Sequence, residues 1–212
     1  MRVLDLFSGT QSVGKVCREH GWEYVSLDRD LPADIQCDIM TWDYTVYKPG
    51  HFDVITASPV CSFWSCQRAC NIGRKNKGTE NYYTRELIEA DIEAIGKPMV
   101  DRTREIIAYL QPRHFWIENP QTSRMKDYIT DLPYYDVDYC MYSDWGYRKR
   151  TRFWTDIPGF TALVCTGGCG YKIGNRHMSG MADIGGGGDR TRRYRVPARL
   201  IEELLAAALA GQ

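Results

Sequence analysis

Two side chains that could take part in covalent catalysis follow predicted strands of this sequence. Cys61 comes just after the apolar run at residues 52–56, which is typical of a buried strand that ends at a proline turn. Glu118 lies near the end of a second apolar strand at residues 114–120. Because parallel strands share their carboxyl ends, we expect both side chains at one edge of a sheet. Cys61 is then a candidate nucleophile, and the alternative is a cysteine that only packs in the core.

A second group of residues is typical of nucleotide binding. Residues 3–7 predict a strand, residues 8–10 a turn, and residues 12–20 a helix. Backbone N–H groups at the start of such a helix face a bound ligand. The next strand ends in Asp28, about 20 residues further on, a spacing suited to an acid that binds a ribose hydroxyl. A helix-capping aspartate is the alternative.

The remaining elements complete an α/β sheet. Alternating apolar residues predict strands at residues 135–142 and 150–156, which we expect to pair antiparallel at the edge of the sheet. Residues 83–110 predict helix, which the Gly-Lys-Pro sequence at residues 96–98 should divide in two. A final amphipathic helix is predicted for residues 198–209.

Composition describes an ordinary globular chain of 212 residues with 43% hydrophobic and 25% charged residues. No apolar run reaches the length of a membrane span, and no signal peptide is expected, so we expect a cytoplasmic protein with reduced cysteines. The formal net charge is zero, but basic clusters at residues 74–77, 148–152 and 190–195 suit a polyanionic partner. Each cluster taken singly is equally consistent with a solvated surface.

Six short motifs, in this order, resemble those of the DNA (cytosine-5)-methyltransferase family across most of the chain. They are DLFSGT at residues 5–10, Asp28, the pair Asp38 and Ile39, SPVC at residues 58–61 with Ser65, the pair Glu118 and Asn119, and RTR at residues 150–152. The resemblance implies a Rossmann-like, class I S-adenosylmethionine-dependent methyltransferase fold. In it an α/β sheet carries helices on both faces and an antiparallel strand pair at one edge. Residues 1–212 would form a single catalytic domain.

The resemblance also implies methyl transfer from S-adenosylmethionine to C5 of cytosine in DNA, with the base flipped out of the duplex. Cys61 would add to C6, because cytosine C5 becomes nucleophilic only after such an addition. Glu118 would hold N3, and Arg150, with Arg152 beside it, would hold O2 and favour the Cys61 thiolate.

Further roles follow from the same resemblance. The implied cofactor-binding residues are Asp5, Phe7, Ser8, Gly9, Thr10, Gln11, Ser12, Asp28, Arg29, Asp38, Ile39, Ser58 and Pro59. The implied substrate-binding residues are Ser65, Asn119, Arg148 and Lys149.

The sequence departs from the family at several positions. Val60 stands where the family has a proline before the cysteine, and Gln11 stands where it has a glycine. Residues 157–192 form only a short, Gly-rich insertion in place of a target-recognition domain. The chain therefore resembles a minimal, phage-type member, which would act in the host cytoplasm. It would read little DNA sequence, or read it with this insertion and the loop at residues 66–83.

Three alternatives to DNA C5 methylation remain open. The Ser58-Pro59 pair is similar to loops of enzymes that methylate exocyclic amino groups, which would give N4-methylcytosine or N6-methyladenine. Methylation of cytosine in tRNA uses the same nucleophile chemistry. A degenerate member would bind nucleic acid or cofactor without turnover.

A metal site is a separate hypothesis. Cys165, Cys169 and His177 lie on the Gly-rich insertion and offer three of the four ligands of a structural zinc ion, with Cys140 or another cysteine as the fourth. No obligate protein partner is evident from the sequence.

Overall fold

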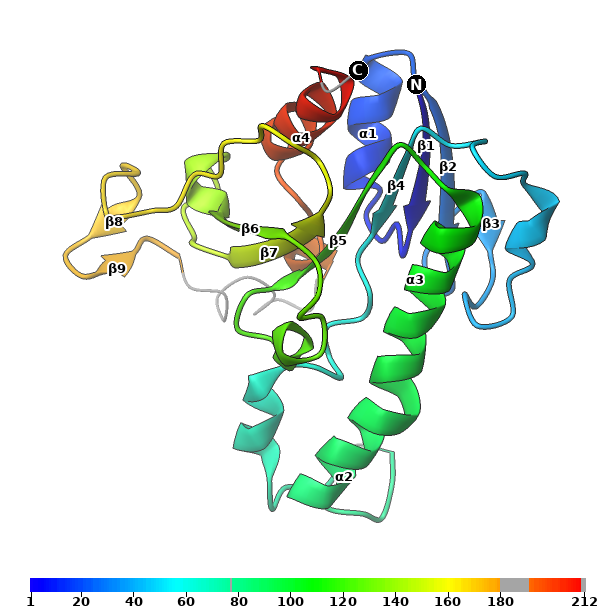
Figure 1. The fold of residues 1–212 in the computed structure, drawn as a ribbon. Coiled ribbons are helices and arrows are strands. Elements are labelled where there is room, and N and C mark those ends of the chain that lie inside the picture. The colour runs from blue at the N-terminus through cyan, green and yellow to red at the C-terminus, as the bar shows by residue number, and fades with distance from the viewer. Residues whose placement is uncertain (77, 180–190, 211–212) are drawn as a thin grey trace.

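A seven-stranded sheet forms the centre of the computed structural model, which describes residues 1–76, 78–179 and 191–210 (Figure 1). The strand order is β3-β2-β1-β4-β5-β7-β6, and β7 is antiparallel to both of its neighbours. The sheet strands are β1 (Arg2–Leu6), β2 (Glu23–Asp28), β3 (Ile35–Gln36), β4 (Val54–Ala57), β5 (His114–Pro120), β6 (Tyr134–Asp138) and β7 (Arg150–Thr155). The predicted Rossmann-like α/β fold, with an antiparallel pair at one edge, is confirmed.

Helices cover both faces of the sheet. The α-helices are α1 (Ser12–Glu19), α2 (Arg85–Asp91), α3 (Lys97–Leu110) and α4 (Ala198–Ala210). Figure 1 shows α1 and α4 side by side, with the long α3 on the other side of the sheet. Leu4, Ile55 and Ile117 share one core with α2 and α3, whereas Val3 and Trp116 share the other core with α1 and α4. Neighbouring residues of each strand thus enter different cores, because strand side chains alternate between faces.

Helix α1 lies close to the sheet because Gly14 has no side chain. Val13, Val16 and Cys17 are buried with Gly14 on one face of the helix. A Cβ atom added at Gly14 would come within 2.5–2.9 Å of the Tyr24 ring, on β2. The glycine therefore sets the distance between the helix and the sheet beside the first loop.

The predicted division of the helix at residues 83–110 is wrong. Helix α2 continues into α3 through a π-helical turn, η3 (Ile92–Gly96), and Pro98 lies in the first turn of α3. The Lys97 N–H bonds to the Ile92 carbonyl, five residues back. This wider turn accommodates a proline without ending the helix.

Several predicted boundaries also change. The strand predicted to reach residue 142 ends at Asp138, and the 3₁₀ turn η5 (Tyr139–Met141) follows it. The segment predicted as loop at residues 66–83 begins with the 3₁₀ helix η2 (Cys66–Asn71). The Gly-rich insertion contains a small hairpin of β8 (Lys172–Ile173) and β9 (Arg176–His177).

Short 3₁₀ turns complete the description. They are η1 (Tyr44–Val46), η4 (Arg124–Asp127) and η6 (Thr191–Arg193). The four-glycine tract at residues 185–188 of the Gly-rich insertion lies outside the described residues. Within the described part of the chain, no helix has the length and apolar character needed to cross a bilayer.

We predict that Gly14→Ala destabilises the protein by about 1–3 kcal/mol, because an added methyl group would overpack against Tyr24. This cost exceeds the gain of up to about 1 kcal/mol that alanine brings to a helix interior. The matched control is Lys15→Ala on the exposed face of α1, which should change stability by less than about 0.5 kcal/mol. Urea unfolding measures both variants, and a Gly14→Ala protein as stable as Lys15→Ala would contradict this account of the packing.

Candidate functional site

The loop after β1 has a backbone conformation that few sequences adopt. Phe7, Gly9 and Gln11 all have positive φ angles, of 60°, 52° and 53°. Residues other than glycine rarely adopt such angles, and strained backbone of this kind is concentrated at ligand sites. The Ser8 N–H bonds to the Leu27 carbonyl, so the strained turn is held against the end of β2.

Asp28 shapes the same loop. One carboxylate oxygen accepts the Gly9 N–H at 2.8 Å, and the other accepts the N–H groups of Asp30 and Leu31 at 2.9 and 2.8 Å. Each carboxylate oxygen has more than one acceptor direction, so Asp28 can still accept a ribose hydroxyl. Its position at the end of β2, against the Gly9 turn, is the one that the sequence predicts.

Asp5 supports this loop from behind. It is 4% exposed and accepts hydrogen bonds from the Tyr24 hydroxyl at 2.8 Å and the Thr56 hydroxyl at 2.7 Å. Burial raises the pKa of Asp5 to about 6, although both hydrogen bonds oppose the shift. The carboxyl group therefore connects β1 to β2 and β4, and its oxygens face protein groups.

The other predicted cofactor residues surround this loop. The Ser12 hydroxyl accepts the Val196 N–H at 3.1 Å and lies 3.2 Å from the Thr10 hydroxyl, so the segment before α4 is fastened to the start of α1. The Gln11 side chain donates to the Pro32 carbonyl at 3.0 Å.

Asp38 and Ile39, which are predicted to bind the cofactor, lie in different environments. Asp38 lies 3.5 Å from Arg29, which also pairs with Asp30. Ile39 is 3% exposed and belongs to the core that α3 covers. Asp38 thus remains at the surface while Ile39 packs beneath it.

The Cys61 loop is held at several points. The Ser58 N–H bonds to the Leu6 carbonyl, and the Asn119 side chain donates to the Pro59 carbonyl at 2.8 Å. Beyond the cysteine, Trp64 is 2% exposed and packs against Gly96, where an added Cβ would lie 3.1 Å from its ring. Ser65 caps η2 by accepting the Gln67 N–H at 3.3 Å. Asn119, predicted as a substrate-binding residue, therefore holds the Cys61 loop in place.

Cys61 and Glu118 lie at the same edge of the sheet, as the sequence predicts. Burial raises the pKa of the Cys61 thiol above its ordinary value, the positive charge of Lys149 opposes this shift, and the negative charge of Glu118 adds to it. The predicted stabilisation of the thiolate by Arg150 and Arg152 is not found. Among the described residues, Lys149 is the cation whose charge lowers the pKa of the thiol.

Glu118 has two close polar neighbours. It is 6% exposed, the Lys149 ammonium lies 3.7 Å from its carboxylate, and the Tyr139 hydroxyl donates to it at 3.3 Å. The Lys149 ammonium also lies 4.9 Å from the centre of the Tyr139 ring and donates to the Arg193 carbonyl at 3.2 Å. The arrangement combines a thiol, a carboxyl group and a buried cation.

The arginines of the RTR motif lie on the opposite face of β7. Glu118 pairs directly with Phe153 across β5 and β7, so alternation puts Thr151 and Lys149 on the face of Glu118. Arg150 and Arg152 point the other way. They form ion pairs with Asp138 at 2.7 Å and with Asp136 at 2.7 Å, their partners in the register of β6 and β7.

Asp138, at the end of β6, is a buried carboxylate with several hydrogen-bond donors. It is fully buried and accepts hydrogen bonds from Arg148, Arg150 and the Cys165 N–H. Burial acts to raise the pKa of its carboxyl group, but the bonds from Arg150, the Cys165 amide and Arg148 hold this pKa below its usual value. Arg148, predicted to bind substrate, is therefore engaged with protein.

Sequence reasoning missed Tyr139, Asp136 and Asp138, and it did not give Lys149 a part in the chemistry. One signal was available for Lys149. Side chains of a strand alternate, so Lys149 and Arg150 cannot both face Glu118. The direct pairing of Glu118 with Phe153, which selects Lys149, becomes visible only in the folded sheet.

Three cysteines and a histidine form a separate cluster beyond β6. They are Cys140, Cys165, Cys169 and His177, and their potential ligand atoms all lie within 4.8 Å of one another. The structure therefore brings together the three predicted metal ligands with Cys140, the cysteine named first as a possible fourth.

Comparison with known proteins gives one strong match. The chain is 48% identical over 219 residues to the "Probable DNA (cytosine-5)-methyltransferase" of Frog virus 3 (isolate Goorha), over 97% of this chain and 99% of that protein. No protein-family model matches the chain.

Solved structures give weaker matches. A S-adenosylmethionine-dependent methyltransferase from Archaeoglobus fulgidus has 12% identity and a TM-score of 0.39 over 66% of this chain. The S. pombe Dnmt2 methyltransferase has 14% identity and a TM-score of 0.39 over 87% of this chain. The matches span 65% and 53% of those two chains.

The charges around Cys61 predict how its alkylation depends on pH. Because burial raises the pKa of this thiol, we expect its alkylation by iodoacetamide to reach half of the maximal rate at a higher pH than alkylation of an unstructured cysteine peptide. Replacing Lys149 with methionine should move this midpoint further up, and replacing Glu118 with glutamine should move it down. Mass spectrometry of the Cys61 peptide measures the rate, and a midpoint at or below that of the unstructured peptide would contradict the assignment.

Proposed function

Because the chain belongs to the DNA (cytosine-5)-methyltransferase family, we propose that it transfers the methyl group of S-adenosylmethionine to C5 of cytosine in DNA through a covalent adduct with Cys61. The observation that supports this reaction most is the meeting of Cys61, Glu118 and Lys149 at the carboxyl edge of the sheet. A methyltransferase acting on an exocyclic amino group has no need of a thiol at this position.

The cofactor would occupy the strained loop after β1. The positive φ angles of Phe7 and Gln11, and a buried Ser8 hydroxyl that has no hydrogen-bond partner among the described residues, fit a site shaped for a ligand. In our proposal Asp28 accepts from the ribose hydroxyls, and Asp38 with Ile39 borders the adenine. S-adenosylmethionine supplies the methyl group as an electrophilic sulfonium.

Cys61 makes the cytosine ring reactive. Its thiolate forms a bond to C6, and the displaced ring electrons make C5 an enamine-like nucleophile. As C5 takes the methyl group, the bond from that methyl to the donor sulfur would break, with S-adenosylhomocysteine as the leaving group. A water molecule would then accept the C5 proton, its electron pair would return to the ring, and the bond between the Cys61 sulfur and C6 would break to restore the thiolate. Asn119 keeps the cysteine in place through the Pro59 carbonyl.

Glu118 and Lys149 stabilise the ring during the addition. A carboxyl group at Glu118 donates a proton or a strong hydrogen bond to N3, which lets the ring accept electrons. We assign the contact with O2 to Lys149 in place of Arg150, because Lys149 shares the face of Glu118. The Lys149 ammonium has three N–H donors; the Arg193 carbonyl accepts one at 3.2 Å and Glu118 lies 3.7 Å away, so in this proposal a further donor serves O2.

The substrate, in our proposal, is a cytosine flipped out of DNA. Flipping costs a few kcal/mol for a base inside a duplex. Residues 157–192 are too short for a separate recognition domain, so we propose a single catalytic domain with a reduced insertion and little sequence selectivity. Arg148, with a side chain 40% exposed, can reach a phosphate group in this proposal.

The covalent step has a direct test. DNA containing 5-fluorocytosine should form an adduct with the protein in the presence of S-adenosylmethionine, because fluorine at C5 cannot leave as a proton does. Cys61→Ala should abolish the adduct while it still binds the cofactor, and Glu118→Gln should slow methylation of ordinary DNA by about 10²–10⁴-fold. Cys70→Ser, on the exposed η2, is the matched control and should retain the adduct.

Mass spectrometry of the nucleosides identifies the product. Normal methylation by Cys61→Ala would overturn the mechanism. N4-methylcytosine or N6-methyladenine as the product would replace C5 chemistry with amino methylation, and a preference for tRNA over DNA would change the substrate. Cofactor binding without any methyl transfer would identify a degenerate member.

The roles of Lys149 and Arg150 can be separated. Lys149→Gln should lower kcat by about 10²–10³-fold in a protein that remains folded, as expected for loss of a donor to developing charge. Arg150→Gln should instead cost about 3–5 kcal/mol of stability, because it removes a partner from the buried Asp138. The opposite result would assign the O2 contact to Arg150. In that case the Arg150→Gln protein would be stable but have a lowered kcat, and the Lys149→Gln protein would remain active.

A further inference from the structure

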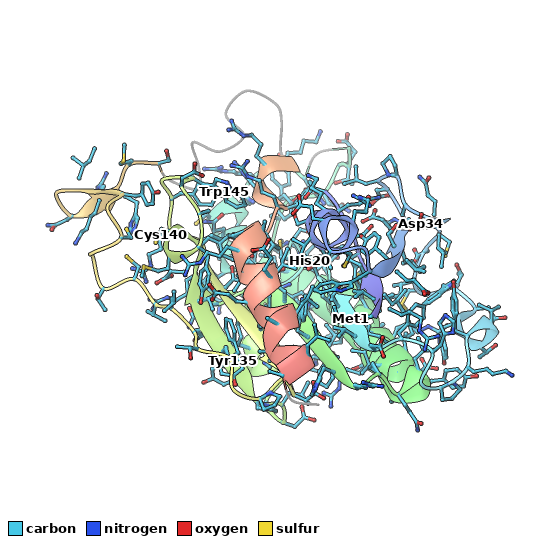
Figure 2. All side chains as sticks on the ribbon, turned by 90° about the horizontal axis from the view of Figure 1, so that it is seen from above. Met1, His20, Asp34, Tyr135, Cys140 and Trp145 are labelled. Atoms are coloured by element: carbon cyan, nitrogen blue, oxygen red, sulfur yellow. The ribbon has the colours of Figure 1, made fainter. Side chains whose placement is uncertain are left out.

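The thiol cluster lies where the insertion meets the sheet. Cys140 lies on η5, directly after β6, whereas Cys165 and Cys169 lie in the loop that leads to β8, and His177 ends β9. Figure 2 shows Cys140 on the side of the molecule from which β8 and β9 extend. Four potential ligands from two distant parts of the chain thus meet at one point.

The distances match a tetrahedral zinc site. The Nε2 atom of His177 lies 3.6 Å from the Cys165 sulfur and 3.3 Å from the Cys169 sulfur. Zinc bonds of about 2.3 Å to sulfur and 2.0–2.1 Å to nitrogen place tetrahedral ligands about 3.6–3.8 Å apart. All four ligand atoms lie within 4.8 Å of one another, so small shifts bring them to one metal ion.

Two other readings of the cluster fit less well. The first alternative is a disulfide, but none of the eight cysteines, all of which lie in the described residues, forms one. Simple apolar packing would explain the buried Cys140 and Cys165, but it would not direct an imidazole nitrogen at two thiol groups. Three thiolates and one imidazole form a familiar ligand set for structural zinc.

We propose that Cys140, Cys165, Cys169 and His177 bind one structural zinc ion. Four protein ligands leave no open position for water or substrate, so the ion has a structural role and no part in methyl transfer. The proposal stands apart from the proposed function, because it needs neither the cofactor nor DNA.

The hairpin needs such a ligand to be ordered. Strands β8 and β9 have two residues each, and Ile173 is 69% exposed, so the hairpin buries little apolar surface. An isolated hairpin of this kind is marginally stable at best in water. A zinc ion would stabilise the folded hairpin, because the free energy of metal binding adds to the free energy of folding when the site forms only in the folded protein.

The zinc ion would also stabilise the edge of the sheet near Glu118. The Cys165 N–H donates to Asp138 at 2.8 Å, and Asp138 in turn holds Arg148 and Arg150. Cys140 follows Tyr139, whose hydroxyl donates to Glu118. Zinc would therefore connect the short insertion to the strands that carry Glu118 and its neighbours.

Metal analysis of the full-length protein tests the proposal. We expect inductively coupled plasma mass spectrometry to find about one zinc per chain after equilibration with zinc and gel filtration. Cobalt substitution should give the visible absorption of tetrahedral cobalt bound to thiolates. Cys169→Ser and His177→Ala should each lower zinc retention at least tenfold in a chelator competition.

Matched controls keep the result interpretable. Cys66→Ser and Cys70→Ser alter exposed cysteines outside the cluster and should retain zinc fully. If the cluster variants do not fold, the wild-type protein still decides the matter, because its zinc content and cobalt spectrum need no variant. A folded wild-type protein that retains no zinc, a cobalt spectrum without thiolate ligands, or equal zinc loss in the Cys66→Ser and Cys70→Ser proteins would overturn the proposal, whatever the outcome of the methylation assays.

Discussion

The antiparallel register of β7 between β5 and β6 decides which charges meet at the site. Side chains of a strand alternate between faces, so a shift of one residue would exchange Lys149 for Arg150 beside Glu118. The observed register pairs each arginine with an aspartate of β6 and leaves the lysine with the carboxyl group. The cation that acts on Cys61 is thus selected by backbone pairing, and the ion pairs of Arg150 and Arg152 in turn favour that pairing.

Asp138 connects the β7 register to a part of the chain outside the site. A fully buried carboxylate needs several donors to remain charged, and it obtains them from Arg148, Arg150 and the Cys165 amide. Two of these donors belong to β7 or the residues before it, and the third belongs to the insertion. The same carboxylate therefore holds together the edge of the sheet and the start of the thiol cluster.

The loop after β1 and the Cys61 loop are both held by hydrogen bonds to neighbouring strands of the sheet. The strained conformation of Phe7 is maintained because the Ser8 and Gly9 N–H groups donate hydrogen bonds to the neighbouring strand β2. The Cys61 loop likewise depends on Asn119, at the end of β5. Both loops are thereby fixed to one edge of the sheet, where our proposal places the cofactor and the thiol.

The sequence by itself determined the parallel strands, a turn after β1, and the placement of Cys61 and Glu118 at one edge of the sheet, because these depend on local pattern and on the shared direction of parallel strands. It also named three members of the thiol cluster. Only the tertiary structure decided that Lys149 lies beside Glu118, that Asp138 holds the arginines, and that Cys140 completes the cluster. These contacts depend on the register of β7 and on chain segments that meet only after folding, which no local pattern specifies.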